Sequence, residues 1–145
     1  MPIEFVDVYQ DSLASWFLWD VLRDRMDDPD VNISATMPTW EEHVKFFNSK
    51  PYPLWFLISN GREYVGYISL TNRNEIGIVI LKEHHNKGYG SSAVKKLMDE
   101  YDLFPPIPSE RVGKFIANIN PLNTKSIEMF ERLGFKHIQN TYKYG

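Results

Sequence analysis

A run of seven residues, Glu75–Leu81, is the feature that most restricts how this chain can fold. It reads Glu-Ile-Gly-Ile-Val-Ile-Leu, and such a near-continuous apolar segment is typical of a strand that is buried on both faces. We therefore predict that it forms the central strand of a sheet. Two more strands are predicted at Leu54–Ser59 and Glu63–Leu70, because they flank Asn60-Gly61, the dipeptide best suited to a type I′ hairpin turn.

Helical periodicity lies on both sides of this hairpin. A first helix, capped by Asp11 or Ser12, is predicted to run to about Met26 and is ended by Asp27–Asp30. Thr39 and Glu42 predict a capping box at the start of a second helix. A third helix is predicted over about Gly88–Asp102. The apolar residues that we expect on the packed faces of these helices are Leu13, Trp16, Phe17, Val21 and Leu22, then Trp40, Val44 and Phe47, and finally Ala93, Val94, Leu97, Met98 and Tyr101.

The remaining elements lie towards the two ends of the chain. A well-buried first strand is predicted at Ile3–Val8 and a later strand at Arg111–Ile119. Asn120-Pro121 then supplies an N-cap with proline at the first helical position, and Gly134 supplies the C-cap of that helix. A last strand is predicted at Phe135–Tyr144. The element order is therefore β-α-α-β-β-β-α-β-α-β, an α+β fold around a mixed sheet.

The composition fits one globular domain over residues 1–145. Hydrophobic residues make up 43% and charged residues 24% of the chain, and no repeat or long linker divides it. The absence of cysteine excludes disulfides and thiolate nucleophiles. A net charge of −3 argues against a nucleic-acid partner. No apolar run reaches the roughly 18 residues of a membrane helix, so we expect no membrane partner and a cytoplasmic location.

A glycine-containing turn separates the apolar strand from the third helix. It reads His85-Asn86-Lys87-Gly88-Tyr89-Gly90-Ser91, and its two glycines allow a tight turn that directs successive N–H groups at one point near the positive end of the helix dipole. A pyrophosphate would fit there. Glycines that merely relax the backbone of the turn are an equally good explanation. The spacing differs from that of nucleoside triphosphate loops and of dinucleotide loops.

From His85 to Gly90 the turn resembles the signature of the GNAT family of N-acetyltransferases, which is Arg or Gln, two residues, Gly, one residue, then Gly or Ala. A second block, Asn123 to Phe135, is similar to the family's asparagine, small residue, aromatic and Gly-Phe pattern. The resemblance implies a GNAT-like sheet that splays between the strands at 75–81 and 111–119. It also implies that acetyl-CoA binds in the gap as the acetyl donor.

The same resemblance implies which residues bind acetyl-CoA. The thioester carbonyl is assigned to a backbone N–H near Ile80, the pyrophosphate to the N–H groups of residues 86–91, and the pantetheine to Asn123. Lys87 either assists with phosphate charge or is simply solvated. The complete set of implied cofactor-binding residues is Ile78, Ile80, His85, Asn86, Lys87, Gly88, Tyr89, Gly90, Ser91, Asn123, Ser126 and Phe130.

Two residues depart from the family's usual pattern. Phe130 stands where many members have a tyrosine that protonates the leaving thiolate. Water or another group must then supply that proton, or the thiolate must leave unassisted. His85 replaces the usual Arg or Gln and carries a charge only when it is protonated, so we expect coenzyme A to bind more tightly as the pH falls through the histidine range.

Two residues are candidates for the general base of an acetyl transfer. Glu75 opens the apolar strand, where some family members place a base carboxylate, although a solvated carboxylate at a turn is the plainer interpretation. His43 lies on an apolar face of the second helix and is more typical of a packing residue. His84, His85 and His137 lack the spacing of a ligand set, so we predict no metal.

The acceptor is expected to contact residues 10–53. Residues 1–60 carry ten acidic and four basic side chains, which favours a cationic amine over a phosphate-bearing acceptor. By contrast, the Arg23-Asp24 pair and the helix after Thr39 are loosely similar to amino-sugar-nucleotide acetyltransferases. Our preferred hypothesis is a small-molecule amine or amino sugar as the acceptor. A protein N-terminal or lysine acetyltransferase, as in the ribosomal-protein branch, and a non-catalytic acyl-CoA-binding module stay open, and so does a homodimer.

Overall fold

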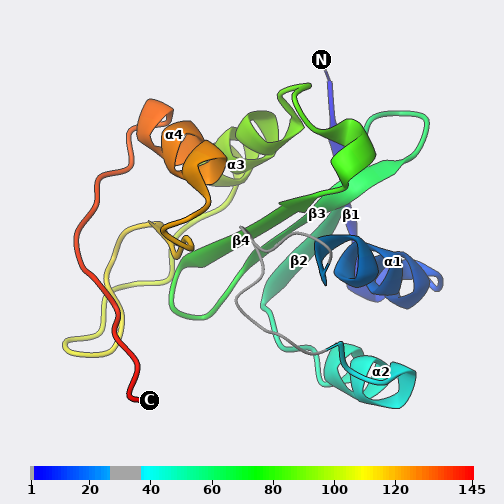
Figure 1. Ribbon diagram of the computed structural model, residues 1–145, viewed down its shortest axis with the longest axis horizontal. Helices are drawn as coiled ribbons and strands as arrows, with labels where there is room; N and C mark the ends of the chain where they lie inside the picture. Colours follow the sequence, from blue (N-terminus) through cyan, green and yellow to red (C-terminus); the bar gives the residue numbers. More distant parts are fainter. Residues whose placement is uncertain (1, 27–36) are drawn as a thin grey trace.

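The computed structural model describes residues 2–26 and 37–145, and the predicted helix end at Asp27–Asp30 lies outside them. The described residues form a five-stranded sheet in the order β1-β2-β3-β4-β5 (Figure 1). Neighbouring strands from β1 to β4 are antiparallel, and β4 and β5 are parallel, so the sheet is mixed as predicted. The strands are β1 (Glu4–Asp7), β2 (Leu54–Ser59), β3 (Tyr64–Leu70), β4 (Glu75–Ile80) and β5 (Ile116–Ala117).

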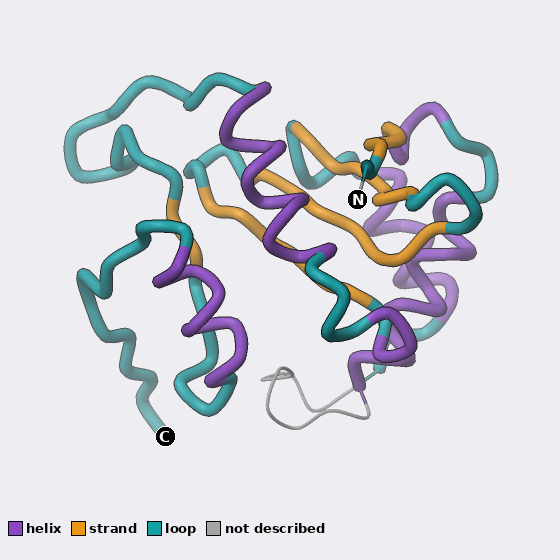
Figure 2. Tube along the Cα trace, turned by 90° about the horizontal axis from the view of Figure 1, so that it is seen from above, coloured by secondary structure: helices purple, strands orange, loops and turns teal. Residues whose placement is uncertain are grey.

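Helices cover both faces of this sheet (Figures 1 and 2). One core joins α3 and α4 to one face of the sheet, and a second core joins α1 and α2 to the other face. The α+β class is therefore confirmed. The described helices are α1 (Ala14–Met26), α2 (Trp40–Asn48), α3 (Tyr89–Glu100) and α4 (Thr124–Arg132), with short 3₁₀ turns η1 (Val8–Gln10) and η2 (Lys82–His84). In the described part of the chain, no helix is long and apolar enough to cross a membrane.

The side chains of β4 alternate between the two cores. Ile76, Ile78 and Ile80 pack into the core that contains α3. Val79 pairs with Tyr67 of β3, and Tyr67 packs into the core on the α1 side, so the odd-numbered side chains of β4 face α1. This alternation places Glu75 on the same face of the sheet as α1.

The start of α2 was predicted better than the packed face of α1. α2 has the predicted capping box, in which Thr39 and Glu42 exchange hydrogen bonds between side chain and backbone. In α1 the predicted packed face is right for Val21, which is buried, and for Phe17, which packs against the core, but the helix also buries Ala14 and Leu18, which were not predicted. The predicted Leu13 and Trp16 are exposed, and Trp16 stacks on Trp40 at 4.4 Å between ring centroids.

The hairpin between β2 and β3 is present, but its turn is not type I′. Gly61 has a φ of +93°, whereas Asn60 is not among the residues with positive φ. The Asn60 side chain instead accepts hydrogen bonds from the N–H groups of Arg62 and Glu63, which makes a longer loop. An irregular register at Ile58/Ser59 accommodates the extra residues.

β4 is less central and less buried than predicted. Only Ile76 is fully buried, because β5 pairs with β4 at two positions, Glu75↔Ile116 and Ile76↔Ala117. The predicted strand at Arg111–Ile119 is thus far shorter, since Arg111 pairs with Ile107 in the loop before it. β1 is also only partly buried, because it is an edge strand.

The C-terminal region departs most from the prediction. α4 is capped by Asn123, and Asn120-Pro121 forms a turn before it. At the other end, Gly134 has a φ of +99° and the Gly134 and Phe135 N–H groups bond back to Glu131 and Phe130, so glycine terminates α4 as predicted. The predicted last strand at Phe135–Tyr144 is absent, and residues 136–145 are exposed without ladder partners among the described residues.

Asn74 connects the turn before β4 to the loop that leads into β5. Its side chain is fully buried, donates to the carbonyl oxygens of Phe104 and Val112, and accepts from the Phe104 N–H, all at 2.9 Å. Its backbone carbonyl also accepts from the Ile116 N–H. One asparagine therefore holds the point at which β4 and β5 come together.

We predict that Asn74→Ala destabilises the fold by about 2–4 kcal/mol, because it leaves buried backbone groups unpaired and puts alanine at a positive φ. Urea unfolding measures this change. Asn72→Ala is the matched control, because Asn72 is exposed and its loss is expected to cost less than about 0.5 kcal/mol. Equal effects of the two substitutions would contradict the role of Asn74.

Candidate functional site

The start of α3 presents a group of unpaired backbone donors. The Ser92 N–H makes a helical hydrogen bond to the Gly88 carbonyl, so the N–H groups of Tyr89, Gly90 and Ser91 precede the first helical bond. Gly88 lies at the N-cap with a φ of +81° and makes no side-chain cap. The positive end of the helix dipole lies at the same point, so the geometry suits an anionic group.

Glycine is required at positions 88 and 90 of this turn for two different physical reasons. Gly88 is needed for its positive φ, since a Cβ there would meet no atom within 4 Å. A Cβ at Gly90 would lie 3.2 Å from the Met129 sulfur, so Gly90 allows α3 and α4 to approach closely. Asn86 also has a positive φ, at 63°, and Lys87 is exposed beside it.

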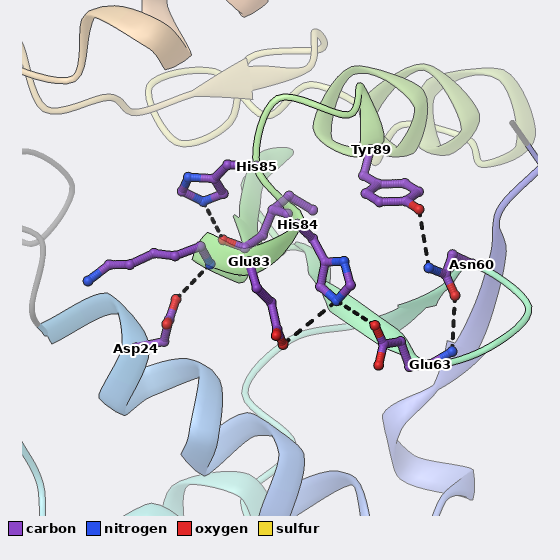
Figure 3. A network of polar contacts seen from close by, with 9 residues as sticks. Asp24, Asn60, Glu63, Glu83, His84, His85 and Tyr89 are labelled. Carbon is purple, nitrogen blue, oxygen red and sulfur yellow. Dashed lines mark hydrogen bonds and ion pairs between the residues drawn. The ribbon is translucent and has the colours of Figure 1, made fainter.

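Neighbouring elements hold the turn in place (Figure 3). Tyr89 is buried, and its hydroxyl accepts a hydrogen bond of 3.1 Å from Asn60 in the β2–β3 loop. Because the Tyr89 ring is buried and its hydroxyl is bonded to Asn60, the backbone is the part of Tyr89 that is left for a ligand. The Lys82 N–H donates to the Asp24 carboxylate of α1 at 3.0 Å, which attaches this segment to α1. Sequence reasoning missed Asn60 and Asp24 in these roles, because no local pattern connects them to the turn.

The His85 side chain turns back onto β4 (Figure 3). Its Nε2 donates to the Ile80 carbonyl at 2.8 Å. The other ring nitrogen, Nδ1, is then an acceptor in the neutral ring and a donor only in the protonated ring. The expectation that His85 helps to bind phosphate at low pH is compatible with this geometry and stays a prediction.

The hydrogen-bond pattern of β4 shows which of its backbone groups face β5. The Thr71 N–H donates to the Glu75 carbonyl and the Leu81 N–H to the Val65 carbonyl, both at 2.9 Å. In an antiparallel pair these bonds recur at every second residue, so the N–H and C=O groups of Ile78 and Ile80 point to the opposite edge. No described strand pairs with that edge beyond Ile76, because the β4–β5 ladder has ended. This edge therefore offers hydrogen bonds to an extended ligand.

The Glu75 carboxylate lies at the closed end of this gap. It accepts hydrogen bonds from Asn118 Nδ2 at 2.7 Å and from Thr71 Oγ1 at 3.2 Å. Asn118 immediately follows β5, so the two strands share this contact, which sequence reasoning missed. Gly77 lies two residues further along in regular register, and its lack of a Cβ allows close approach to Ser69 Oγ rather than a bulge.

Two sequence-predicted site residues have buried side chains. His43 is buried between α2 and α1, where its Nε2 donates to the Ser15 carbonyl at 2.8 Å and its ring packs on Trp19 and Trp40. Phe130 is buried in the core and packs edge-on against Phe135. Both side chains are therefore packing residues in this structure.

The start of α4 carries the remaining predicted residues. The Asn123 side-chain oxygen caps the helix by accepting from the Ser126 N–H at 3.2 Å. Its amide nitrogen makes no hydrogen bond to any described residue and is the donor that a ligand would meet. Among residues 2–26 and 37–145, no group of three His, Cys, Asp or Glu side chains is placed to hold a metal ion.

Comparison with known protein families gives the identity of the fold. Residues 13–136 match the family model described as the acetyltransferase (GNAT) domain, which is most of the chain. The chain belongs to the GNAT family of acetyltransferases. The phosphate-turn and Asn123 blocks that suggested this family lie within the matched residues. No curated protein matches the chain significantly.

Solved GNAT structures share the fold at low sequence identity. An acetyltransferase from Salmonella typhimurium, solved with acetyl-CoA, is 18% identical with a TM-score of 0.66, over 93% of this chain and 79% of its own. A ribosomal-protein-alanine N-acetyltransferase from Brucella melitensis is 16% identical with a TM-score of 0.69, over 96% and 86%. A phosphinothricin acetyltransferase from Sinorhizobium meliloti, solved with acetyl-CoA, is 19% identical with a TM-score of 0.68, over 94% and 76%.

We predict that Gly88→Val weakens acetyl-CoA binding at least about tenfold, because a β-branched residue resists the positive φ that directs the α3 N–H groups. Isothermal calorimetry measures the affinity. Gly134→Val is the matched control, because Gly134 also has positive φ and open space around its Cβ position but ends α4 away from the turn. An unchanged affinity in a folded Gly88→Val protein would overturn this site.

Proposed function

We propose that this protein transfers an acetyl group from acetyl-CoA to the primary amine of a small molecule or amino sugar. One observation carries the proposal: the unpaired N–H groups at the start of α3 adjoin the open edge of β4, where the N–H groups of Ile78 and Ile80 and the Ile78 carbonyl have no described partner, while the Ile80 carbonyl accepts from His85. A diphosphate followed by an extended amide-containing arm has the chemistry to satisfy both. The acetyl-CoA complexes among the structurally similar acetyltransferases support the same donor.

The residues of the gap fit acetyl-CoA in a specific order. The N–H groups of Tyr89, Gly90 and Ser91 bind the pyrophosphate, with Asn86 and Lys87 beside them. The Ile80 N–H, the Ile78 carbonyl and Asn123 Nδ2 bind the pantetheine amides. The Ile78 N–H then binds the thioester oxygen, which polarises the carbonyl and stabilises the negative charge that develops on it.

Glu75 is the proposed general base. Its side chain faces α1, so an acceptor that enters from the α1 face meets Glu75 while acetyl-CoA occupies the gap. Bound acetyl-CoA supplies an activated acyl carbon. The carboxylate takes a proton from the amine, directly or through water, as the nitrogen bonds to that carbon and the C–S bond breaks. The hydrogen bonds from Asn118 and Thr71 orient the carboxylate for this transfer.

The leaving thiolate takes its proton from water in this proposal. Phe130 has no proton to donate and is buried in the core. The products are then an N-acetylated amine and coenzyme A, and Glu75 returns its proton to solvent.

Thiol release from acetyl-CoA in the presence of an amine panel tests this function. Turnover of small amines or amino sugars supports it. Turnover of peptides alone would favour a protein N-terminal or lysine acetyltransferase. Tight acetyl-CoA binding without thiol release on any acceptor would favour a non-catalytic acyl-CoA-binding module, which the buried Phe130 makes the relevant alternative.

We predict that Glu75→Gln lowers kcat by about 10²- to 10⁴-fold with little change in the affinity for acetyl-CoA, because glutamine keeps the size of the side chain but cannot accept the proton. Steady-state thiol release gives both parameters. Glu110→Gln removes the same charge from an exposed loop and serves as the control. A Glu75→Gln variant as fast as the unaltered protein would exclude Glu75 as the base.

A further inference from the structure

A cleft of about 590 Å³ opens on the α1 face of the sheet, beyond the end of β4. Its walls come from α1, the β2–β3 loop and η2, and they carry four carboxylates: Asp20, Asp24, Glu63 and Glu83. Arg23 is the single basic residue in the lining and pairs with Asp20. The lining therefore keeps an excess of negative charge, which attracts cations.

A buried histidine lies behind two of these carboxylates (Figure 3). The His84 side chain is only 7% exposed, and its Nε2 lies 2.9 Å from a Glu63 oxygen and 3.8 Å from a Glu83 oxygen. Neither ring nitrogen makes a hydrogen bond of good geometry, so Nε2 is directed at the cleft wall without a well-aligned partner. Glu63 and Glu83 therefore approach the same His84 nitrogen on one side of the cleft, and a cation bound beside the two carboxylates would reduce the repulsion between them.

The rest of the lining is apolar and aromatic, which favours an organic cation over a metal ion. Phe17 and Tyr64 meet edge to face with 5.5 Å between ring centroids, and Leu81 completes the surface. The Tyr64 hydroxyl donates to Asp11, and that hydrogen bond raises the pKa of Tyr64, so the ring stays neutral. Alkylammonium groups bind well between carboxylates and aromatic rings. The described residues hold no three-ligand metal cluster here.

The cleft lies on the same face of the sheet as the proposed base, within reach of an acceptor bound beside the thioester. Leu81, Val79, Gly77 and Glu75 follow one another along the α1 face of β4, so the cleft and the proposed base share one face. The thioester is proposed to lie beside the Ile78 N–H. Leu81 is three residues further along the chain, which is roughly 10 Å along a strand. An acceptor with one nitrogen beside the thioester could therefore place a second charged group in the cleft.

We propose that the cleft binds a second ammonium group of the acceptor, so that the substrates are amines with at least two cationic nitrogens. This inference rests on the proposed function, because the first nitrogen is the one that is acetylated. It excludes phosphate-bearing acceptors such as nucleotide-linked amino sugars, since their phosphates would meet the carboxylates of the cleft. Glu63 and Glu83 determine the specificity.

The test compares linear diamines of four to ten methylenes with monoamines of equal length as acetyl acceptors. We expect kcat/KM to favour the diamine by about tenfold at the best length, and the preference to fall in high salt because exposed charges are screened. In the double variant Glu63→Gln/Glu83→Gln the preference is expected to fall to about twofold or less. The double variant Glu110→Gln/Glu131→Gln removes two exposed carboxylates outside the cleft lining; it is the charge-matched control and is expected to keep the preference.

Calorimetry with octamethylenediamine alone separates this inference from the proposed function. Diamine binding that is lost in the double variant, without turnover of any amine, supports the cleft and overturns the proposed acetyl transfer. Equal turnover of diamines and monoamines, or a preference unchanged in the double variant, overturns the cleft and leaves acetyl transfer intact. If the protein neither binds octamethylenediamine nor acetylates any amine, both proposals fail.

Discussion

The early end of the β4–β5 ladder is the constraint on which the rest of this structure depends. Backbone N–H and C=O groups need hydrogen-bond partners. On β4, every second residue finds these partners in β3. Beyond Ile76 the intervening residues have no strand partner in the described chain. Asn74 fixes the place where the strands meet, and the start of α3 fixes the other end of the open edge. In the proposed complex, the amides and the diphosphate of acetyl-CoA occupy this open edge and the start of α3.

The two faces of β4 carry residues with different roles. On the α3 side, Ile76, Ile78 and Ile80 pack into the core, which makes β4 a rigid wall. On the α1 side, the odd-numbered residues carry Glu75 at one end and Leu81, beside the acidic cleft, at the other. Period-two alternation therefore separates the residues that stabilise the strand from those that face the acceptor in the proposed function.

Hydrogen bonds between distant segments hold the turn at 85–91. Asn60 bonds to Tyr89, and Asp24 bonds to the Lys82 N–H, which attaches the turn to the hairpin and to α1. Such bonds restrict the turn before any ligand arrives, so less conformational entropy is lost on binding. The same elements form the acidic cleft, so the turn and the cleft belong to one connected unit.

The sequence by itself determined the features that depend on local patterns. The capping box at Thr39, the glycine end of α4, the order of most elements and the glycine turn before α3 all follow from short-range spacing, because caps and turns are satisfied by residues a few positions away. Tertiary structure alone decided how far β5 pairs with β4, that the tail after Phe135 forms no strand, and that His43 packs inside while Glu75 meets Asn118. Those outcomes depend on contacts between segments far apart in the chain, and no periodicity within one segment specifies its partner in another.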